Sequence, residues 1–113
     1  MDALAASTQF ERAGIRRAIS ALLASAEVIP LDAHILRLAA HAEGDYELSG
    51  QDSIVLASVL SHLEAARPGE SCFLNRNARD FDDPNIRGTL EDLGCKFFAR
   101  FGLALEYILT RIQ

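Results

Sequence analysis

The chain has 113 residues, of which 50% are hydrophobic and 24% are charged, a composition typical of one globular domain and not of a disordered segment. Its 11 Lys and Arg residues are outnumbered by 16 Asp and Glu residues, and the formal charge of -5 excludes binding of nucleic acid through a general basic field. Metal-assisted cleavage of a polyanion remains compatible with this charge, because metal ions can bridge carboxylates to phosphate. The sequence has no membrane-length apolar run and no export signal at its start, so we expect a cytoplasmic protein without membrane contact.

The N-terminal quarter of the sequence predicts a helix followed by a short strand. Apolar side chains recur on one helical face, and Thr8 and Glu11 have the spacing of a capping box, which together predict a helix over about Gln9–Ser25. The following run, Glu27–Leu31, contains β-branched residues and a proline near its end, and it is too short for a helix. We therefore predict a short buried strand there.

Two further helices are predicted in the middle of the chain. Asp32 can cap the first of them, which we expect over about residues 32–41, with Gly44 placed to end it in a surface loop. Ser49 is followed at the capping distance by an aspartate, and a largely apolar stretch then predicts a helix over about residues 49–66. We expect this last helix to be the most buried of the chain.

The C-terminal half alternates strands with helices. Strands are predicted at Ser71–Leu74 and Cys95–Phe98, because each is a short apolar run of the kind found in parallel strands that are covered on both faces. A polar loop, 75–83, and a helix capped by Asp83 lie between them, and a last helix is predicted over about residues 102–112. This alternation predicts an α/β fold with a parallel sheet between helical layers.

The polar loop is the first candidate site, because ligands of open parallel sheets bind at the carboxyl ends of strands. It carries Asn77 and Asp80, each beside an arginine, Arg76 and Arg79 respectively. Carboxylate and amide oxygens suit Mg²⁺ or Mn²⁺ better than zinc. The alternative is that the carboxylates of this loop are solvated or cap the next helix, as Asp83 is expected to do.

A second acidic residue, Asp52, lies in the first turn of the apolar helix. It either stabilises the helix dipole or shares a metal with the acids of the polar loop, and the spacing leaves both possibilities open. The three histidines, His34, His41 and His62, fall on separate predicted helices without metal-ligand spacing. No nucleophile elbow, glycine-rich phosphate loop or C-x-x-C motif supports nucleophilic or dinucleotide chemistry.

Two stretches resemble a known family. The Asp-headed helix Ser49–Ser58, followed by the strand and loop F-L-N-R-N-A-R-D-F at Phe73–Phe81, resembles the C-terminal half of PIN domains, with VapC-type toxins among the similar proteins. The resemblance covers roughly residues 27–108. It implies a three-layer α/β sandwich with a short parallel sheet, and the activity of a nuclease, mostly a ribonuclease, whose acidic residues converge around Mg²⁺ or Mn²⁺.

The resemblance also implies roles for individual residues. Asp52 and Asp80 match acidic positions of the family and would bind the metal, and Asn77 stands where many relatives carry an acid and would supply an oxygen. As an amide it departs from the acidic pattern and argues against a second tightly held metal. Arg76 and Arg79 would position the phosphate of an RNA substrate, single-stranded or structured, and an antitoxin or another protein is the implied partner.

The family pattern begins with a strand that ends in aspartate, and no such strand is predicted before residue 9. Glu11 either serves as the glutamate of the family's next helix or belongs to the capping box. We interpret residues 1–113 as a single PIN-like domain that is incomplete at its N-terminus. The chain is then a piece of a longer protein, closes its sheet around a second copy, or is a divergent non-enzymatic member, and in the last two cases unpaired sheet edges predict a homodimer.

Two hypotheses of function follow from these residues. The first is a PIN-like, divalent-metal-dependent ribonuclease, of toxin type or a truncated member of that family. The alternative is a catalytically inactive binding or regulatory module that pairs with a protein partner through its open sheet edge. A phospho-acceptor signalling domain is a weaker third option, because the sequence lacks the acidic pair and strand-end lysine in the required order.

Overall fold

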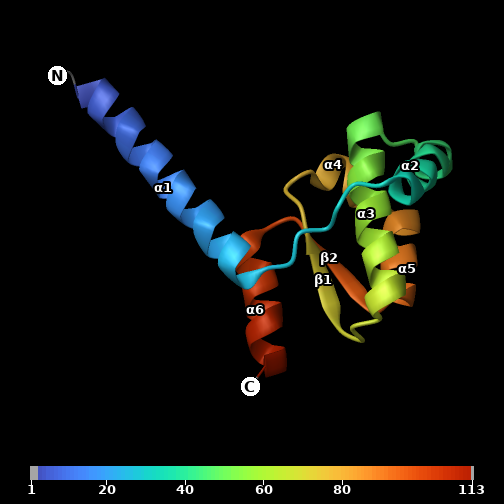
Figure 1. Ribbon diagram of the computed structural model, residues 1–113. Helices are drawn as coiled ribbons and strands as arrows, with labels where there is room; N and C mark the ends of the chain where they lie inside the picture. The colour runs from blue at the N-terminus through green and yellow to red at the C-terminus, as the bar shows by residue number, and fades with distance from the viewer. Residues whose placement is uncertain (1–2, 113) are drawn as a thin grey trace. The chain divides into compact units, whose positions relative to one another are not determined.

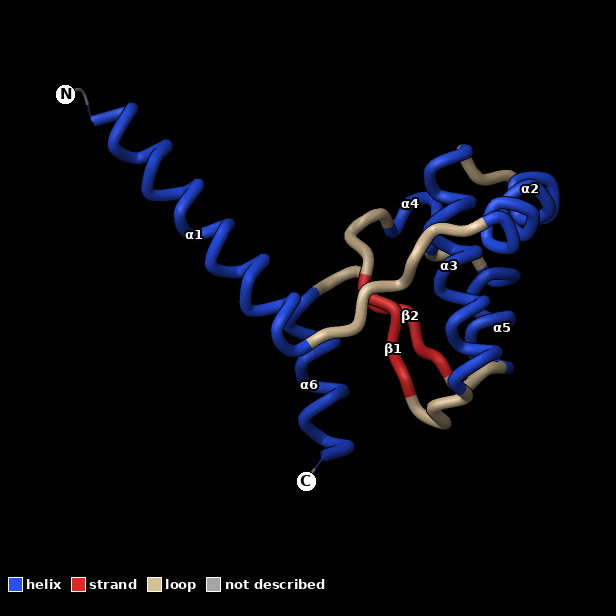
Figure 2. Tube along the Cα trace, in the orientation of Figure 1, coloured by secondary structure: helices blue, strands red, loops and turns tan. Residues whose placement is uncertain are grey.

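The computed structural model describes residues 3–112, with side chains described from residue 8 onward. The chain combines helices with a two-stranded parallel sheet (Figure 1). Its elements in order are α1 (Ala3–Ser25), α2 (Ala33–Tyr46), α3 (Gly50–Ala66), β1 (Ser71–Leu74), α4 (Ala78–Phe81), α5 (Pro84–Asp92), β2 (Cys95–Phe98) and α6 (Phe101–Ile112) (Figure 2). The chain divides into two compact units, Met1–Pro30 and Leu31–Gln113.

The first unit consists of α1 and the loop that follows it. The predicted helix is confirmed, and it begins at Ala3, earlier than expected, because the alanine-rich start of the chain favours helix. Its last turn is closed by a hydrogen bond of 2.8 Å from the Ser25 hydroxyl to the Ala21 carbonyl oxygen. Within this unit the apolar stripe of α1 has no packed partner, and Phe10 is 75% exposed.

The predicted strand at Glu27–Leu31 is wrong. These residues form a loop, and in the described part of the chain the two strands pair only with each other. Pro30 has no N–H group to donate to a neighbouring strand, and Val28 is 68% exposed. A β-branched run therefore does not become a strand here, because no partner supplies the ladder of hydrogen bonds.

Helix α2 begins where expected but ends later. Asp32 caps it by accepting a hydrogen bond of 2.9 Å from a backbone N–H in the first turn. The helix continues through Gly44 to Tyr46 and ends at Glu47, whose φ of 54° is left-handed, so the expected end at Gly44 is wrong. A hydrogen bond of 2.9 Å between the Tyr46 hydroxyl and the Thr89 hydroxyl ties this extra turn to α5, which offsets the low helix propensity of glycine.

The other helices and strands predicted in the second unit are confirmed with small shifts. The predicted polar loop 75–83 is wrong in part, because Ala78–Phe81 form the short helix α4, which Asn77 caps and whose last residue is buried in the core. Helix α3 starts after Ser49, whose hydroxyl accepts a hydrogen bond of 3.2 Å from the backbone N–H of Asp52. Strands β1 and β2 have their predicted bounds, and their parallel register pairs Phe73 with Phe97. Helices α3 and α5 cover one face of the sheet, here called the inner face, and α6 lies against the other, the outer face (Figure 1).

The core lies between the inner face and these helices. Phe81, the last residue of α4, is 0% exposed, and its ring centroid lies 5.3 Å from that of Phe73 in an edge-to-face arrangement. Leu56 of α3 and Ile86 and Leu90 of α5 close the cluster around it. Phe81 therefore anchors the polar loop after β1 to the core, and this anchor fixes the residues just before it.

A tight turn aligns the start of the two strands. Gly94 has a φ of 74°, and a Cβ at this position would collide with the carbonyl oxygen of Gly69. The Gly94 carbonyl oxygen accepts a hydrogen bond of 3.0 Å from the backbone N–H of Ser71. Only glycine combines this close backbone approach with a left-handed conformation at no steric cost.

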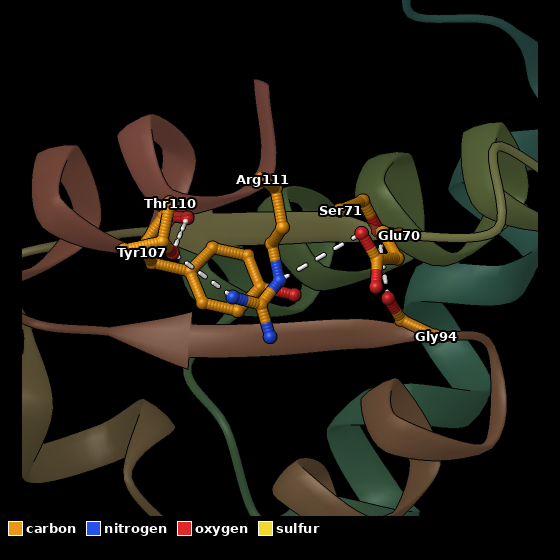
Figure 3. Close-up of polar contacts among 6 residues, drawn as sticks. All are labelled: Glu70, Ser71, Gly94, Tyr107, Thr110 and Arg111. Carbon is orange, nitrogen blue, oxygen red and sulfur yellow. Dashed lines mark hydrogen bonds and ion pairs between the residues drawn. The ribbon is translucent and has the colours of Figure 1, made fainter. Parts of the chain in front are cut away.

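Aromatic and cationic side chains hold α6 to the outer face of the sheet. The Tyr107 ring lies 5.2 Å from the Phe98 ring, and the Arg111 guanidinium lies 3.9 Å from the centroid of Tyr107 (Figure 3). Arg111 also forms a salt bridge of 3.7 Å with Glu70, which precedes β1. Among the helices that the structure describes, none has the length and apolar character to cross a membrane.

Candidate functional site

The candidate site begins at the carboxyl end of β1. The backbone N–H of Asn75 donates a hydrogen bond of 3.0 Å to the Phe98 carbonyl oxygen, so the pairing with β2 continues one residue past the strand. The side-chain oxygen of Asn75 then accepts a hydrogen bond of 2.8 Å from the backbone N–H of Asn77. An asparagine that bonds the backbone two residues ahead forms a tight turn, and this turn directs the chain back toward α3.

Asn77 both ends this turn and begins α4. Its side-chain oxygen accepts a hydrogen bond of 3.3 Å from the backbone N–H of Asp80, which is the usual geometry of a helix N-cap. Asp80 thus lies in the first turn of the short helix, and the next residue is the buried Phe81. The N-cap hydrogen bond accepted by Asn77 and the burial of Phe81 together fix the position of Asp80.

The amide of Asn77 joins two carboxylates from different elements. Its nitrogen, Nδ2, donates a hydrogen bond of 2.9 Å to Oδ2 of Asp80 and one of 3.2 Å to Oδ2 of Asp52. Asp52 comes from the first turn of α3, and its side chain is half-buried, whereas that of Asp80 is exposed. The structure therefore brings Asp52, Asn77 and Asp80 together, and these three residues are called the carboxylate cluster below.

The electrostatics of the carboxylate cluster favour a cation. Two carboxylates share one neutral amide donor, so the side chains of the cluster carry negative charge that no cationic side chain neutralises among the described contacts. Oxygen ligands from carboxylates are those that Mg²⁺ and Mn²⁺ prefer, and Mg²⁺ in proteins is often held by one or two carboxylates with water completing the octahedron. Within the described residues, no group of three or more His, Cys, Asp and Glu side chains could hold a metal ion, so the cluster offers two carboxylates and one amide.

The remaining charged residues of the polar loop have other positions. Arg76 and Arg79 are exposed, and neither forms a salt bridge in the part of the chain that the structure describes. Asp82 pairs with Arg87 at 3.2 Å, and Asp83 caps α5 by accepting hydrogen bonds of 2.8 Å and 3.3 Å from two backbone N–H groups. Capping and surface pairing thus account for these last two acids, and capping also accounts for the contact of Asn77 with Asp80, but not for that of Asn77 with Asp52.

The two cysteines do not form a nucleophilic site. Both are free thiols, and Cys95 is 2% exposed on the inner face of the sheet. Burial raises the pKa of the Cys95 thiol, with a smaller opposing effect from a hydrogen bond with Ser71, and burial also raises the pKa of Cys72. A thiol with a raised pKa stays protonated at neutral pH and is a poor nucleophile.

A cavity that the sequence did not indicate lies at the end of β2. Its volume is about 310 Å³, and its cationic lining residues are Arg87, Lys96 and Arg100. They come from α5, from β2 and from the segment before α6, and no motif spacing links them. The only signal available in the sequence was that Arg100 comes two residues after a predicted strand.

Comparison of the chain with protein-family models, with curated proteins and with solved structures finds no match in any of the three. The resemblance to PIN domains therefore depends on the motif residues of this chain alone. In the structure, the carboxylates of Asp52 and Asp80 both accept hydrogen bonds from the side-chain amide of Asn77, and this geometry supports a functional role for the three residues.

Proposed function

We propose that the chain is a divalent-metal-dependent ribonuclease of PIN-like build, in which Asp52 and Asp80 bind one Mg²⁺ or Mn²⁺ ion. The observation that carries the proposal is the pair of hydrogen bonds, 3.2 Å and 2.9 Å long, from one Asn77 nitrogen to the two carboxylates. These carboxylates are 28 residues apart in the sequence, and a fold that places both within reach of one atom favours a shared ligand. The arrangement of α3 and α5 on one face of the sheet and α6 on the other is compatible with a three-layer sandwich.

The donor set fits a single, weakly held ion. Two carboxylates are within the usual number for protein-bound Mg²⁺, and Asn77 can supply a third oxygen if its amide turns. When bound, the divalent ion would stabilise the negative charge that develops on the phosphate during hydrolysis. Cationic residues of the chain would then bind that phosphate and hold it over the carboxylate cluster.

Arg76 and Arg79 are suited to this task. Both are exposed and flank Asn77 and Asp80 in the sequence, and their guanidinium groups can donate paired hydrogen bonds to phosphate oxygens. A phosphate so held is oriented by the protein before water attacks it, and positioning is a large part of catalysis. RNA as the substrate, an antitoxin or another protein as a partner, and the homodimer all stay predictions.

Calorimetric titration of the whole chain with Mn²⁺ tests the proposal. Asp52→Asn and Asp80→Asn keep the size of each side chain and remove its charge, and each is expected to weaken Mn²⁺ binding roughly tenfold or more. Asp92→Asn is the matched control, because Asp92 ends α5 just before β2 begins and lies away from the carboxylate cluster. Equal binding by the wild type, Asp52→Asn and Asp80→Asn would contradict the proposal.

Cleavage assays complete the test. Single-stranded and hairpin RNA are incubated with the wild type and the three variants in Mn²⁺, and parallel samples contain EDTA. We expect cleavage by the wild type and by Asp92→Asn in Mn²⁺ only. Cleavage that persists in EDTA or in an Asp52→Asn, Asp80→Asn double variant would show a metal-independent activity elsewhere in the preparation or in the chain.

One observation favours the alternative, a binding module without catalysis. The carboxylate cluster holds two acids, whereas the family that the sequence resembles uses three or four. The same calorimetry separates the two functions. A folded wild-type chain that binds no Mn²⁺ at millimolar concentration supports the binding module and excludes the nuclease.

A further inference from the structure

Helix α1 exposes an apolar stripe that no other described residue of the first unit covers. Ile15, Ile19 and Leu22 lie on this stripe, and 59%, 51% and 62% of their surfaces are exposed. The helix has 23 residues and runs without interruption (Figure 1). Most helices in proteins are stabilised by packing an apolar face against a partner and not by propensity alone. The stripe of α1 is therefore a surface on which a partner should bind.

The spacing of the stripe is that of a coiled coil. Ile15, Ile19 and Leu22 follow one another at intervals of four and three residues, which are the intervals between the two apolar positions, a and d, of a heptad repeat. In this register Ile19 takes position a, whereas Ile15 and Leu22 take position d. Isoleucine at a followed by leucine at d favours two parallel strands. The apolar spacing thus indicates another helix as the partner.

The charged residues of α1 indicate which helix that is. In the same register Glu11 takes position g, and Arg16 takes the next position e. In a parallel pair of helices, position g of one helix lies beside the following position e of the other, and salt bridges between these positions select the partner and its orientation. Glu11 of one copy then meets Arg16 of the partner subunit, and the two-fold symmetry of the pair repeats this contact.

Glu11 and Arg16 have no oppositely charged neighbour on their own helix. Both side chains are exposed, and neither forms a salt bridge in the described part of the chain. Side chains that are three or four residues apart face each other along a helix, and at those distances from either residue the sequence has no opposite charge. A second copy of α1 supplies the charges that one copy lacks.

The orientation of the pair follows from the same charges. In an antiparallel pair, position g faces g and position e faces e, so Glu11 would meet no arginine and Arg16 would lie near its own copy. Arg12 takes position a, and a polar residue at a single a position fixes the register of a coiled coil at a cost in stability. The parallel arrangement is therefore the one that the sequence of α1 favours.

We propose that α1 pairs with α1 of a second copy of the chain in a parallel, two-stranded coiled coil. Ile15, Ile19 and Leu22 form the apolar seam, and Glu11 and Arg16 of the two copies pair beside it. Because the seam spans only about two heptads, the dimer is reversible and its population depends on protein concentration. This surface is distinct from the open edge of the sheet, and the inference is independent of the proposed ribonuclease function.

Sedimentation equilibrium of the whole chain over a range of concentrations tests the proposal. The mass of the wild type is expected to rise from 12.3 kDa toward twice that value. Ile19→Ala and Leu22→Ala keep a good helix former and remove a seam side chain from both copies, so each should weaken dimerisation about tenfold or more. Phe10→Ala is the matched control, because Phe10 is 75% exposed on the same helix but takes position f, away from the seam. It should dimerise as the wild type does.

Charge reversal tests the pairing and its parallel orientation. Glu11→Arg and Arg16→Glu each place like charges beside the seam and should weaken self-association about fivefold or more. One variant carries only arginine at the two positions and the other only glutamate, so an equimolar mixture restores both ion pairs and should dimerise as the wild type does. These variants change exposed side chains, and circular dichroism checks that each keeps its helix content.

Each outcome supports or overturns the coiled coil. A wild type that stays monomeric up to millimolar concentration, or a dimer that Ile19→Ala and Leu22→Ala leave unchanged, would exclude it. An equal loss for Phe10→Ala would show non-specific association of an apolar helix, and a mixture of the charge variants that does not associate would contradict the parallel pairing. A monomeric wild type that binds phosphatidylglycerol vesicles through the same residues would assign the stripe to a membrane surface and also overturn the inference.

Discussion

The inner and outer faces of the sheet use alternate residues of the same two strands, yet they are packed very differently. On the inner face Phe73 is 7% exposed and Cys95 is 2% exposed, whereas the adjacent Leu74, on the outer face, is 41% exposed. Helix α6, which lies against the outer face, buries only Ala104 among its described residues. The inner face therefore carries most of the buried core, and the outer face is held to α6 by aromatic and cationic contacts between partly exposed side chains.

The largest expected effect is on the inner face. Phe81→Ala removes a fully buried ring that contacts Phe73 and Phe97, and we expect it to lower the free energy of unfolding by about 3–5 kcal/mol. Urea unfolding followed by circular dichroism measures this change. Because α4 is anchored by this ring, the variant should also lose Mn²⁺ binding before it unfolds globally.

Leu74→Ala is the control for that prediction. It removes a side chain of similar size from the outer face of β1, where 41% of its surface is already exposed, and should cost less than half as much as Phe81→Ala. Equal losses for the two variants would show that both faces carry the core, and the contrast between them would then be wrong.

Tyr107→Ala tests what holds α6 to the outer face. The ring contacts Phe98 at 5.2 Å and the Arg111 guanidinium at 3.9 Å, and such aromatic and cation–π pairs contribute about 1–2 kcal/mol together. Urea unfolding should show a loss of that size. A loss as large as that of Phe81→Ala would place an essential part of the core on the outer face.

Asn77→Asp probes the carboxylate cluster at the end of this sheet. Aspartate is also a good N-cap, so α4 should persist, but the amide donor is lost and three carboxylates meet, which we expect to cost about 1 kcal/mol without metal. With Mn²⁺ the added carboxylate should tighten binding and reverse this loss. Thermal unfolding with and without Mn²⁺ measures both effects.

Asn85→Asp adds the same charge to the first turn of α5, which contributes no residue to the carboxylate cluster, and serves as the control for Asn77→Asp. It should show no dependence on Mn²⁺. If Asn77→Asp gains no stability from Mn²⁺ relative to this control, Asn77 does not lie beside a metal site.

The sequence predicted most elements of the second unit because their signals are local, whereas the short helix α4 was missed because the burial of Phe81 depends on distant residues such as Leu56 and Leu90. Ser49 and Asp83 are caps that bond within their own turn, and β1 and β2 are short apolar runs bounded by glycine or polar residues. The strand at 27–31 was wrong because a strand depends on a distant partner that its own residues do not specify. The end of α2 was wrong for the same reason, since Tyr46 is held by Thr89 of another helix.

The contacts of the candidate site also divide into local contacts, which the sequence indicates, and contacts between distant segments, which it does not. Asn77 and Asp80 are three residues apart, and their contact follows from a local cap that the sequence pattern indicates. The contact with Asp52 crosses 25 residues, and its expectation came from the family resemblance and not from spacing. The lining of the cavity was not foreseen, because Lys96 and Arg100 meet Arg87 only through the packing of α5 on β2.

Burial of the two thiols makes the stability of the fold depend on pH. Burial raises the pKa of Cys95 and of Cys72 above the ordinary value of 9.0, so the folded chain holds these protons at a pH where the unfolded chain releases them. Stability is therefore complete below about pH 9 and falls as the pH rises through the folded-state values. Urea unfolding between neutral and alkaline pH should show this fall, and Cys95→Ala should reduce it, whereas a wild type without any fall would contradict it.

The smallest effect is expected for the salt bridge of the outer face. Glu70 and Arg111 are 3.7 Å apart, with 68% and 42% of their side chains exposed, so Glu70→Gln should change the free energy of unfolding by less than about 0.5 kcal/mol. Arg111→Ala should cost more, because it also removes the guanidinium that stacks on Tyr107. Urea unfolding of both variants at low and at high salt separates the two contributions, since screening weakens the ion pair more than the stacking. A cost for Glu70→Gln equal to that for Tyr107→Ala would mean that charge, and not aromatic contact, holds α6 to the sheet.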